Sequence, residues 1–98
     1  MISPGGERAT DTDQFKIKTS LSVAQLAYSI RLLKQSGIIV NDNKAEVIRF
    51  FSKHFSSVNN NNISQESFRS KYFAFETSAV TSIQGILNKM ISISKKDE

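Results

Sequence analysis

The spacing of apolar residues along this 98-residue chain predicts four helices. The first is expected over residues 22–36, where apolar positions recur every three or four residues and form one helical stripe. Ser22 and Gln25 fit a capping box, in which a hydroxyl and an amide satisfy free backbone N–H groups. Gly37 then supplies a left-handed C-terminal cap.

A second helix is predicted over residues 44–56. The Asx-rich turn 41–43 and Glu46 fit its N-terminal cap, because short Asx side chains bond to nearby backbone amides. Its apolar face is wider than a surface helix needs, which indicates either burial between two neighbours or contact with a partner. Arg49 and Lys53 are four residues apart and therefore share the remaining side.

The third helix should begin at Ser64. Ile63, just before this cap, and Phe68, four residues inside the helix, fit a hydrophobic staple. Tyr72 continues the apolar stripe, whereas Phe73 falls off it. This helix is therefore expected to bury one face and to expose the other.

The fourth helix follows Thr77 and Ser78, either of which can cap it. We expect it to fray from Ser94 onward. Its apolar residues recur with the spacing of a coiled-coil seam. The seam residues are Val80, Ile83, Leu87 and Met90.

Two short segments have the pattern of β-strands. Phe15–Thr19 alternates apolar and polar residues, which predicts a strand with Phe15 and Ile17 directed inward. Ile38–Val40 is β-branched and too short to be a helix. The two segments are expected to pair as a ribbon that the helices stabilise, since an isolated two-stranded ribbon is only marginally stable.

These elements predict one mainly α domain, a four-helix winged-helix or helix-turn-helix-like fold with a possible short two-stranded β ribbon. The domain is expected over residues 15–94, between a disordered tail at 1–14 and a frayed end at 95–98. The folded part holds ten Lys or Arg and four acids. A basic domain suits a polyanionic partner, although a small basic excess also serves solubility.

Composition argues against several classes of function. The chain has no Cys, which excludes disulfides and thiolate metal sites. Its one histidine, His54, fits a histidine packed beside Phe50 and Phe55 better than a general base or a pH switch. No stretch approaches the roughly 18 apolar residues of a membrane span, and no secretory signal is evident. We therefore expect a cytoplasmic protein with no membrane association, no catalytic residues, no metal and no cofactor.

Binding of double-stranded DNA is the better supported chemistry. The second helix, a polar turn and the third helix predict a helix-turn-helix whose third helix reads DNA. Polar side chains at its start suit base edges or phosphates, and basic side chains around it suit phosphates. The candidate DNA-binding residues are Lys16, Lys18, Arg49, Lys53, Ser64, Gln65, Ser67, Arg69 and Lys71. The same residues would also fit an ordinary solvated helix face, and the loop between these helices is longer than usual.

The run A-Y-x-x-x-x-L-x-x-S-G-I-I-x-N, followed by K-A-E-V-I-R-F-F-S-K-H-F, resembles the C-terminal domain of the RteC family, the tetracycline-regulated excision regulators of conjugative transposons. There, too, a helix ends in Ser-Gly, and a short turn leads to a helix that ends in spaced aromatic residues. The matching positions are Ser36, Gly37, Ile39, Asn41, Ile48, Phe51, Phe55, Phe68, Arg69, Leu87 and Met90.

The resemblance implies a DNA-binding domain of winged-helix or helix-turn-helix type, acting as a transcriptional regulator of excision on a mobile genetic element. One segment departs from that pattern. The family is rich in Arg and Lys between its last two helices, whereas residues 75–82 here contain no basic residue. The alternative is therefore a protein-interaction module that keeps the fold without binding DNA, or a domain that associates with itself.

Overall fold

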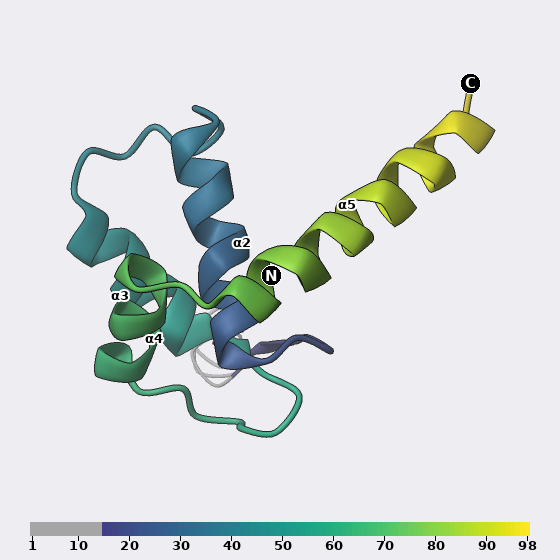
Figure 1. Cartoon of the computed structure of the whole chain (residues 1–98). Coiled ribbons are helices and arrows are strands. Elements are labelled where there is room, and N and C mark those ends of the chain that lie inside the picture. The colour runs from purple at the N-terminus through teal and green to yellow at the C-terminus, as the bar shows by residue number, and fades with distance from the viewer. Residues whose placement is uncertain (1–14) are drawn as a thin grey trace, which may run out of the picture.

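The computed structural model of the chain describes residues 15–98 (Figure 1). Over this range, four helices and a two-stranded sheet follow one another in the order β1–α2–α3–β2–α4–α5. The expectation of a mainly helical domain with a short two-stranded sheet is confirmed. The disorder predicted for residues 1–14 lies outside the described residues.

Helix α2, Val23–Gln35, begins and ends as its sequence predicts. The amide of Gln25 donates to the Ser22 hydroxyl at 3.1 Å, and the Ser22 amide donates back to the Gln25 side chain at 2.9 Å. Gly37 adopts a φ of 87°, the left-handed conformation that ends a helix at little steric cost to glycine. Local chemistry therefore fixes both ends of this helix.

Helices α3, Lys44–His54, and α4, Gln65–Phe73, are also capped by the expected residues. The Asn43 side chain accepts the Glu46 amide at 3.2 Å, and the Ser64 hydroxyl accepts the Ser67 amide at 3.0 Å. Helix α3 ends two residues before the predicted Ser56, because the next two residues form strand β2.

The pairing predicted for the ribbon is wrong. Strand β1, Ile17–Lys18, pairs in parallel with β2, Phe55–Ser56, and not with Ile38–Val40. The amides of Ile38 and Ile39 instead donate to the Leu33 carbonyl at 3.0 and 3.1 Å, which closes the end of α2 and leaves them unavailable to a strand.

The inward orientation predicted for this strand is also wrong. Phe15 and Ile17 are 64% and 48% exposed. A two-residue strand at the edge of the domain has no second layer to cover its side chains, so alternation alone does not bury them. Thr19 anchors the strand instead, since its amide and its hydroxyl both donate to the Ser56 carbonyl, at 3.1 and 2.8 Å.

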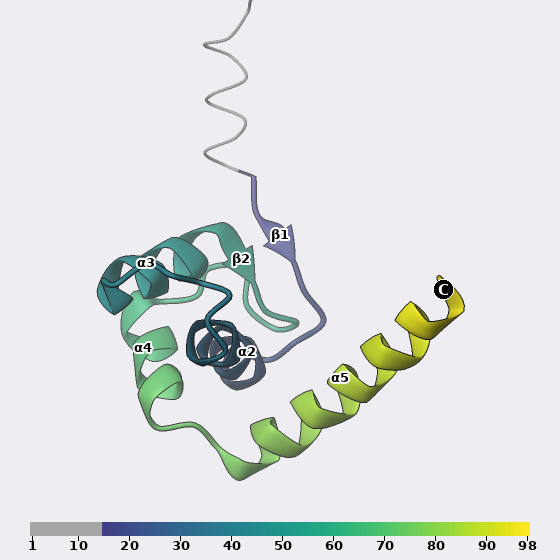
Figure 2. The same ribbon diagram turned by 90° about the horizontal axis from the view of Figure 1, so that it is seen from above.

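The core lies between α2, α3 and α4. Figure 2 looks along α2 and shows α3 and α4 around it. Phe68 of α4 is fully buried, and Ile48 of α3 is almost so. Ile63 and Phe68, the two residues of the predicted staple, both enter this core. The buried core residues are Leu26, Ala27, Ile30, Val47, Ile48, Ile63, Phe68 and Tyr72.

Helix α5, Thr77–Lys96, leaves this three-helix body and projects from it (Figures 1 and 2). Its buried residues, Ala79 and Ile83, lie in its first two turns and pack near α2. The predicted cap by Thr77 or Ser78 is wrong, because the N-cap is Glu76 and no side chain bonds there. The helix also continues to Lys96, past the expected end near residue 94.

Candidate nucleic-acid interface

The residues predicted to bind DNA are spread over separate surfaces. At 3.6 residues per turn, Gln65 and Arg69 lie on one side of α4, while Ser67 and Lys71 lie towards another flank. The basic residues of β1 and α3 occupy two further surfaces, described below. The nine candidates therefore do not form a single face.

Two of the candidates are already engaged by other groups. The Ser64 hydroxyl is held as the cap of α4 by the Ser67 amide. Lys71 forms an ion pair with Glu76, the one such pair within residues 15–98. This pairing neutralises Lys71 locally, so we no longer place it among the residues that would contact phosphate.

The two lysines of the β1 segment lie beside the asparagine-rich loop. The Lys16 ammonium donates to the Asn61 carbonyl at 2.9 Å and to the Asn62 side chain at 2.7 Å. Together with Lys18 and Ser56, these groups line a hollow of about 280 Å³. Lys16 therefore orders this loop, which places its charge next to β2.

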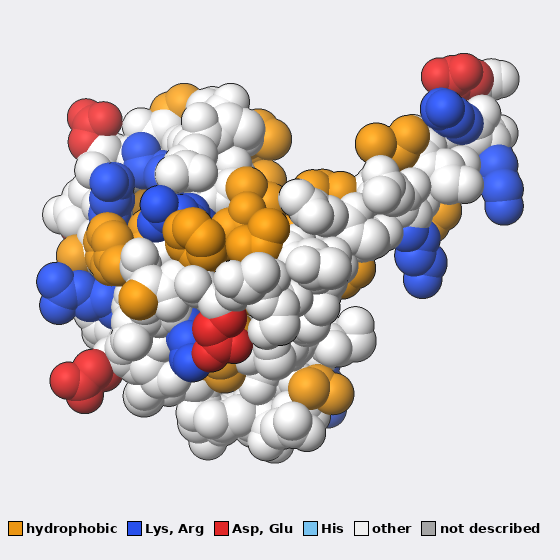
Figure 3. All heavy atoms as spheres, viewed as in Figure 1, with side chains coloured by type: hydrophobic (Ala, Val, Ile, Leu, Met, Phe, Trp, Pro, Cys, Tyr) orange, Lys and Arg blue, Asp and Glu red, His pale blue; other side chains and the backbone are white. Residues whose placement is uncertain are grey.

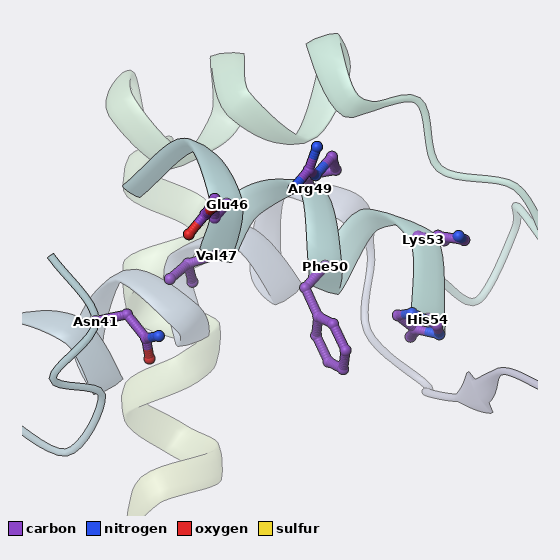
Figure 4. Close-up of a pocket in the computed structure, with 7 residues that line it drawn as sticks. All are labelled: Asn41, Glu46, Val47, Arg49, Phe50, Lys53 and His54. Atoms are coloured by element: carbon purple, nitrogen blue, oxygen red, sulfur yellow. The ribbon is translucent and has the colours of Figure 1, made fainter. Parts of the chain in front are cut away.

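Arg49 and Lys53 share the exposed side of α3, as expected. They line a shallow groove of about 540 Å³ together with Phe50 and His54 (Figure 4). The ring of Phe50 points out from the helix, and its centroid lies 4.3 Å from that of His54. His54 is thus packed against an aromatic neighbour, as its sequence context predicts.

A further group of cations and rings lies where α2, α3 and the C-terminal end of α4 meet. Figure 3 shows Lys and Arg side chains gathered around hydrophobic ones over this part of the molecule. We call this group the cation–aromatic cluster. It consists of Arg31, Lys44, Arg69, Tyr72, Phe73 and Phe75.

Two rings in the cluster hold the cations. The Arg31 guanidinium lies 4.9 Å from the centroid of Phe75. The Lys44 ammonium and the Arg69 guanidinium each lie 6.0 Å from the centroid of Phe73. These distances allow cation–π attraction, which holds long basic side chains near a ring and reduces the entropy that they would lose on binding a ligand.

The cluster keeps its charge and part of its aromatic surface available. Within the described residues, no carboxylate lies within ion-pair distance of Arg31, Lys44 or Arg69. Phe73 and Phe75 are 48% and 45% exposed. Unpaired cations next to exposed rings are a combination that suits phosphates and the faces of nucleic-acid bases.

The cluster continues along α4 as an exposed stripe. Gln65, Arg69 and Phe73 follow one another at four-residue spacing, and all three are exposed. We call these three residues the α4 stripe. Phe73 missed the apolar stripe in the sequence because it belongs to this opposite, solvent-facing side.

Sequence reasoning missed Arg31 and Lys44. A signal was present for Lys44, because it stands at the first position of a helix, where the macrodipole disfavours a cation and a compensating contact is expected. Arg31 gave no local signal. Its guanidinium donates to the Tyr72 carbonyl at 2.9 Å, and this partner is 41 residues away in the sequence.

Tyr72 is the one group of the cluster that is buried deeply. Only 3% of it is exposed. Burial raises the pKa of its hydroxyl above the usual value of 10.0, and the nearby positive charge of Arg31 acts in the opposite direction. Because the folded state holds this proton more tightly than the unfolded state, its contribution to stability is complete below about pH 10 and is lost above it.

We therefore expect the free energy of unfolding to fall as the pH rises above about 10, and part of that fall to disappear in Tyr72→Phe. Urea unfolding between pH 7 and pH 11 measures both. Parallel pH curves for the two proteins would show that ionisation of Tyr72 is not coupled to folding.

Other kinds of site find little support in the described part of the chain. Residues 15–98 contain no group of three or more His, Cys, Asp or Glu side chains that could hold a metal ion. None of the helices in this range is both long enough and apolar enough to span a bilayer.

Comparison with known proteins found no significant match to a family model, to a curated protein or to a solved structure. Function is therefore argued from the surfaces of the chain itself.

Proposed function

We propose that this chain is a non-catalytic DNA-binding domain of the helix-turn-helix type, with α4 as the helix that enters the major groove. The observation that carries the proposal is the exposed α4 stripe, which runs directly into the unpaired cations of the cation–aromatic cluster. A helix that packs one side into the core and offers the other to solvent has the arrangement that a reading helix needs.

Each residue of this surface has a role in the proposal. Gln65 and Arg69 are the side chains for base edges, since amide and guanidinium groups make bidentate contacts with adenine and guanine. Lys44 and Arg31 contact phosphates on the flanking strand. Gln65 stands in the first turn of α4, which points its free end at the DNA.

A helix-turn-helix is favoured over a winged helix. The described sheet has two strands, β1 and β2, and α5 follows α4 after a short connection, in the place where a wing would begin. The lysines of the β1 segment lie at the edge of that sheet and supply additional phosphate contacts in this proposal.

The biological role that we propose follows the resemblance to the RteC family. It is that of a cytoplasmic transcriptional regulator, or an accessory factor, of a mobile genetic element. The basic segment that distinguishes that family is absent from residues 75–82. In this proposal, the cation–aromatic cluster replaces it as the source of positive charge next to α4.

Fluorescence anisotropy with labelled duplex DNA at two salt concentrations tests the proposal. Affinity should fall with salt, because phosphate contacts release counterions. The double variant Lys44→Ala/Arg69→Ala should bind about tenfold or more weakly and show a shallower salt dependence, by roughly one to two contacts.

The matched control is Lys89→Ala, which removes one charge from the exposed part of α5. It should leave both the affinity and the salt dependence nearly unchanged. Binding without salt dependence, or an equal loss in the control, would contradict the proposal.

A protein-interaction role is the second candidate, and one observation favours it. An apolar groove of about 480 Å³ lies between α2 and α5, and no charged side chain lines it. Such a groove suits another protein surface rather than a nucleic acid.

A further inference from the structure

Most of α5 has no partner within the described residues. After Ile83, which is buried, the helix continues for about 13 residues, and the apolar side chains Leu87, Met90 and Ile93 are 41%, 58% and 52% exposed. A helix of this length is only marginally stable in water without tertiary contacts. Its apolar face therefore calls for a covering surface.

The groove lies at the base of this projecting helix. One wall is formed by Ile83, Ile86 and Met90 of α5, and the other by Leu32 and Leu33 of α2. The chain thus carries a projecting apolar ridge and, next to it, an apolar groove. A surface that holds both shapes can pair with a copy of itself, as an isologous two-fold contact requires.

The charges of this region favour a second copy as the occupant. In a two-fold contact each residue faces residues of the same surface, so a charged seam would repel itself. Neither the groove nor the seam of α5 contains a charged residue, and Lys89 is the one charge between Thr77 and Ser94. A helix that lies on a membrane surface instead carries a row of Lys or Arg on its polar face.

The area of this region also approaches what a dimer needs. The 20 residues of α5 span about 30 Å, and a strip one to two helix widths across covers roughly 300–600 Å² in projection. A stable dimer buries about 800 Å² of accessible surface per partner, which includes the relief of interdigitating side chains.

We infer that the chain self-associates through α5, with two copies packed antiparallel so that the projecting half of each α5 fills the groove between α2 and α5 of the other. A parallel pair would join the two projecting halves and leave both grooves open. The antiparallel pair also sets each helix dipole against the opposite end of the other. This inference goes beyond DNA binding and does not depend on it.

Sedimentation equilibrium of the full chain tests the inference. The wild type should show a monomer–dimer equilibrium at micromolar concentrations. Met90→Asp, which places a charge in the seam, should weaken dimerisation at least tenfold, whereas Ser92→Asp should not, because Ser92 lies on the opposite side of α5. Circular dichroism of each variant confirms that the helices are retained.

Engineered cysteines test the direction of the pair, since the chain has none of its own. Oxidation should link two copies of Leu87→Cys, near the middle of α5, and should not link copies of Met90→Cys or Ser92→Cys. Equal linking at residues 87 and 90 would indicate a parallel pair and overturn the geometry.

Two results would overturn self-association through α5 altogether. One is a wild type that stays monomeric at all concentrations, which would assign the groove to a different protein or to another segment of the chain. The other is a dimer that Met90→Asp does not weaken, which would place the contact elsewhere. Neither outcome would bear on DNA binding, which is measured separately with the α4 and α3 variants.

Discussion

Replacing Phe68 by alanine should lower the free energy of unfolding by about 3–5 kcal/mol, the usual loss when a fully buried phenyl ring is removed. Phe68 has no exposed surface and belongs to the core cluster formed by α2, α3 and α4. Domains of this size are stable by only about 5–15 kcal/mol, so the variant should lie at the edge of folding. Urea denaturation followed by circular dichroism measures the loss.

Two variants keep this prediction testable if Phe68→Ala does not fold. Phe68→Leu retains most of the volume and should cost about 1–2 kcal/mol. Phe73→Ala removes the same ring from a site that is 48% exposed and should cost less than about 1 kcal/mol. Equal losses at residues 68 and 73 would contradict the assignment of α4's buried side.

Replacing Arg31 by alanine should cost about 2–3 kcal/mol, which is large for a residue outside the core. Its guanidinium donates to the Tyr72 carbonyl and lies 4.9 Å from the Phe75 ring centroid, so that it joins α2 to the end of α4 and to the segment that leads into α5. A hydrogen bond from a charged donor contributes about 1.5–3 kcal/mol, and a cation–π contact adds about 0.5–2. Thermal or urea unfolding checks this value.

The conservative variant separates charge from geometry. Arg31→Lys keeps the charge but lacks the planar fork that reaches both the carbonyl and the ring, so it should recover less than half of the loss. A double-mutant cycle with Phe75→Ala should show a coupling of roughly 0.5–2 kcal/mol. Additive losses would mean that the contact with the ring does not stabilise the fold.

Features set by neighbouring residues could be predicted from the sequence. The caps at Ser22, Asn43 and Ser64 and the left-handed Gly37 all act within four residues, and the structure contains each of them. The apolar periodicity likewise placed Phe68 and Tyr72 in the core. Helix α5 lacks such a side-chain cap, and its start was the one that was mispredicted.

Features set by distant residues could not be predicted in this way. The pairing of β1 depends on a segment more than 35 residues away, and a β-branched run such as Ile38–Val40 offered an equally plausible partner. The candidate site has the same difficulty. Lys44, Arg69 and Phe73 come together only because α3 packs against α4, so basic residues chosen by type and sequence position did not identify the cluster.

The parallel pairing of β1 with β2 has a consequence for the order of folding. Thr19 and Ser56 are 37 residues apart, and the segment between them contains all of α2 and α3. Closing so long a loop costs entropy that two residues of strand cannot repay alone, whereas helices form from local contacts. The sheet therefore cannot nucleate this fold. It closes after the helices have docked and then fastens the chain before α2 to the connection between α3 and α4.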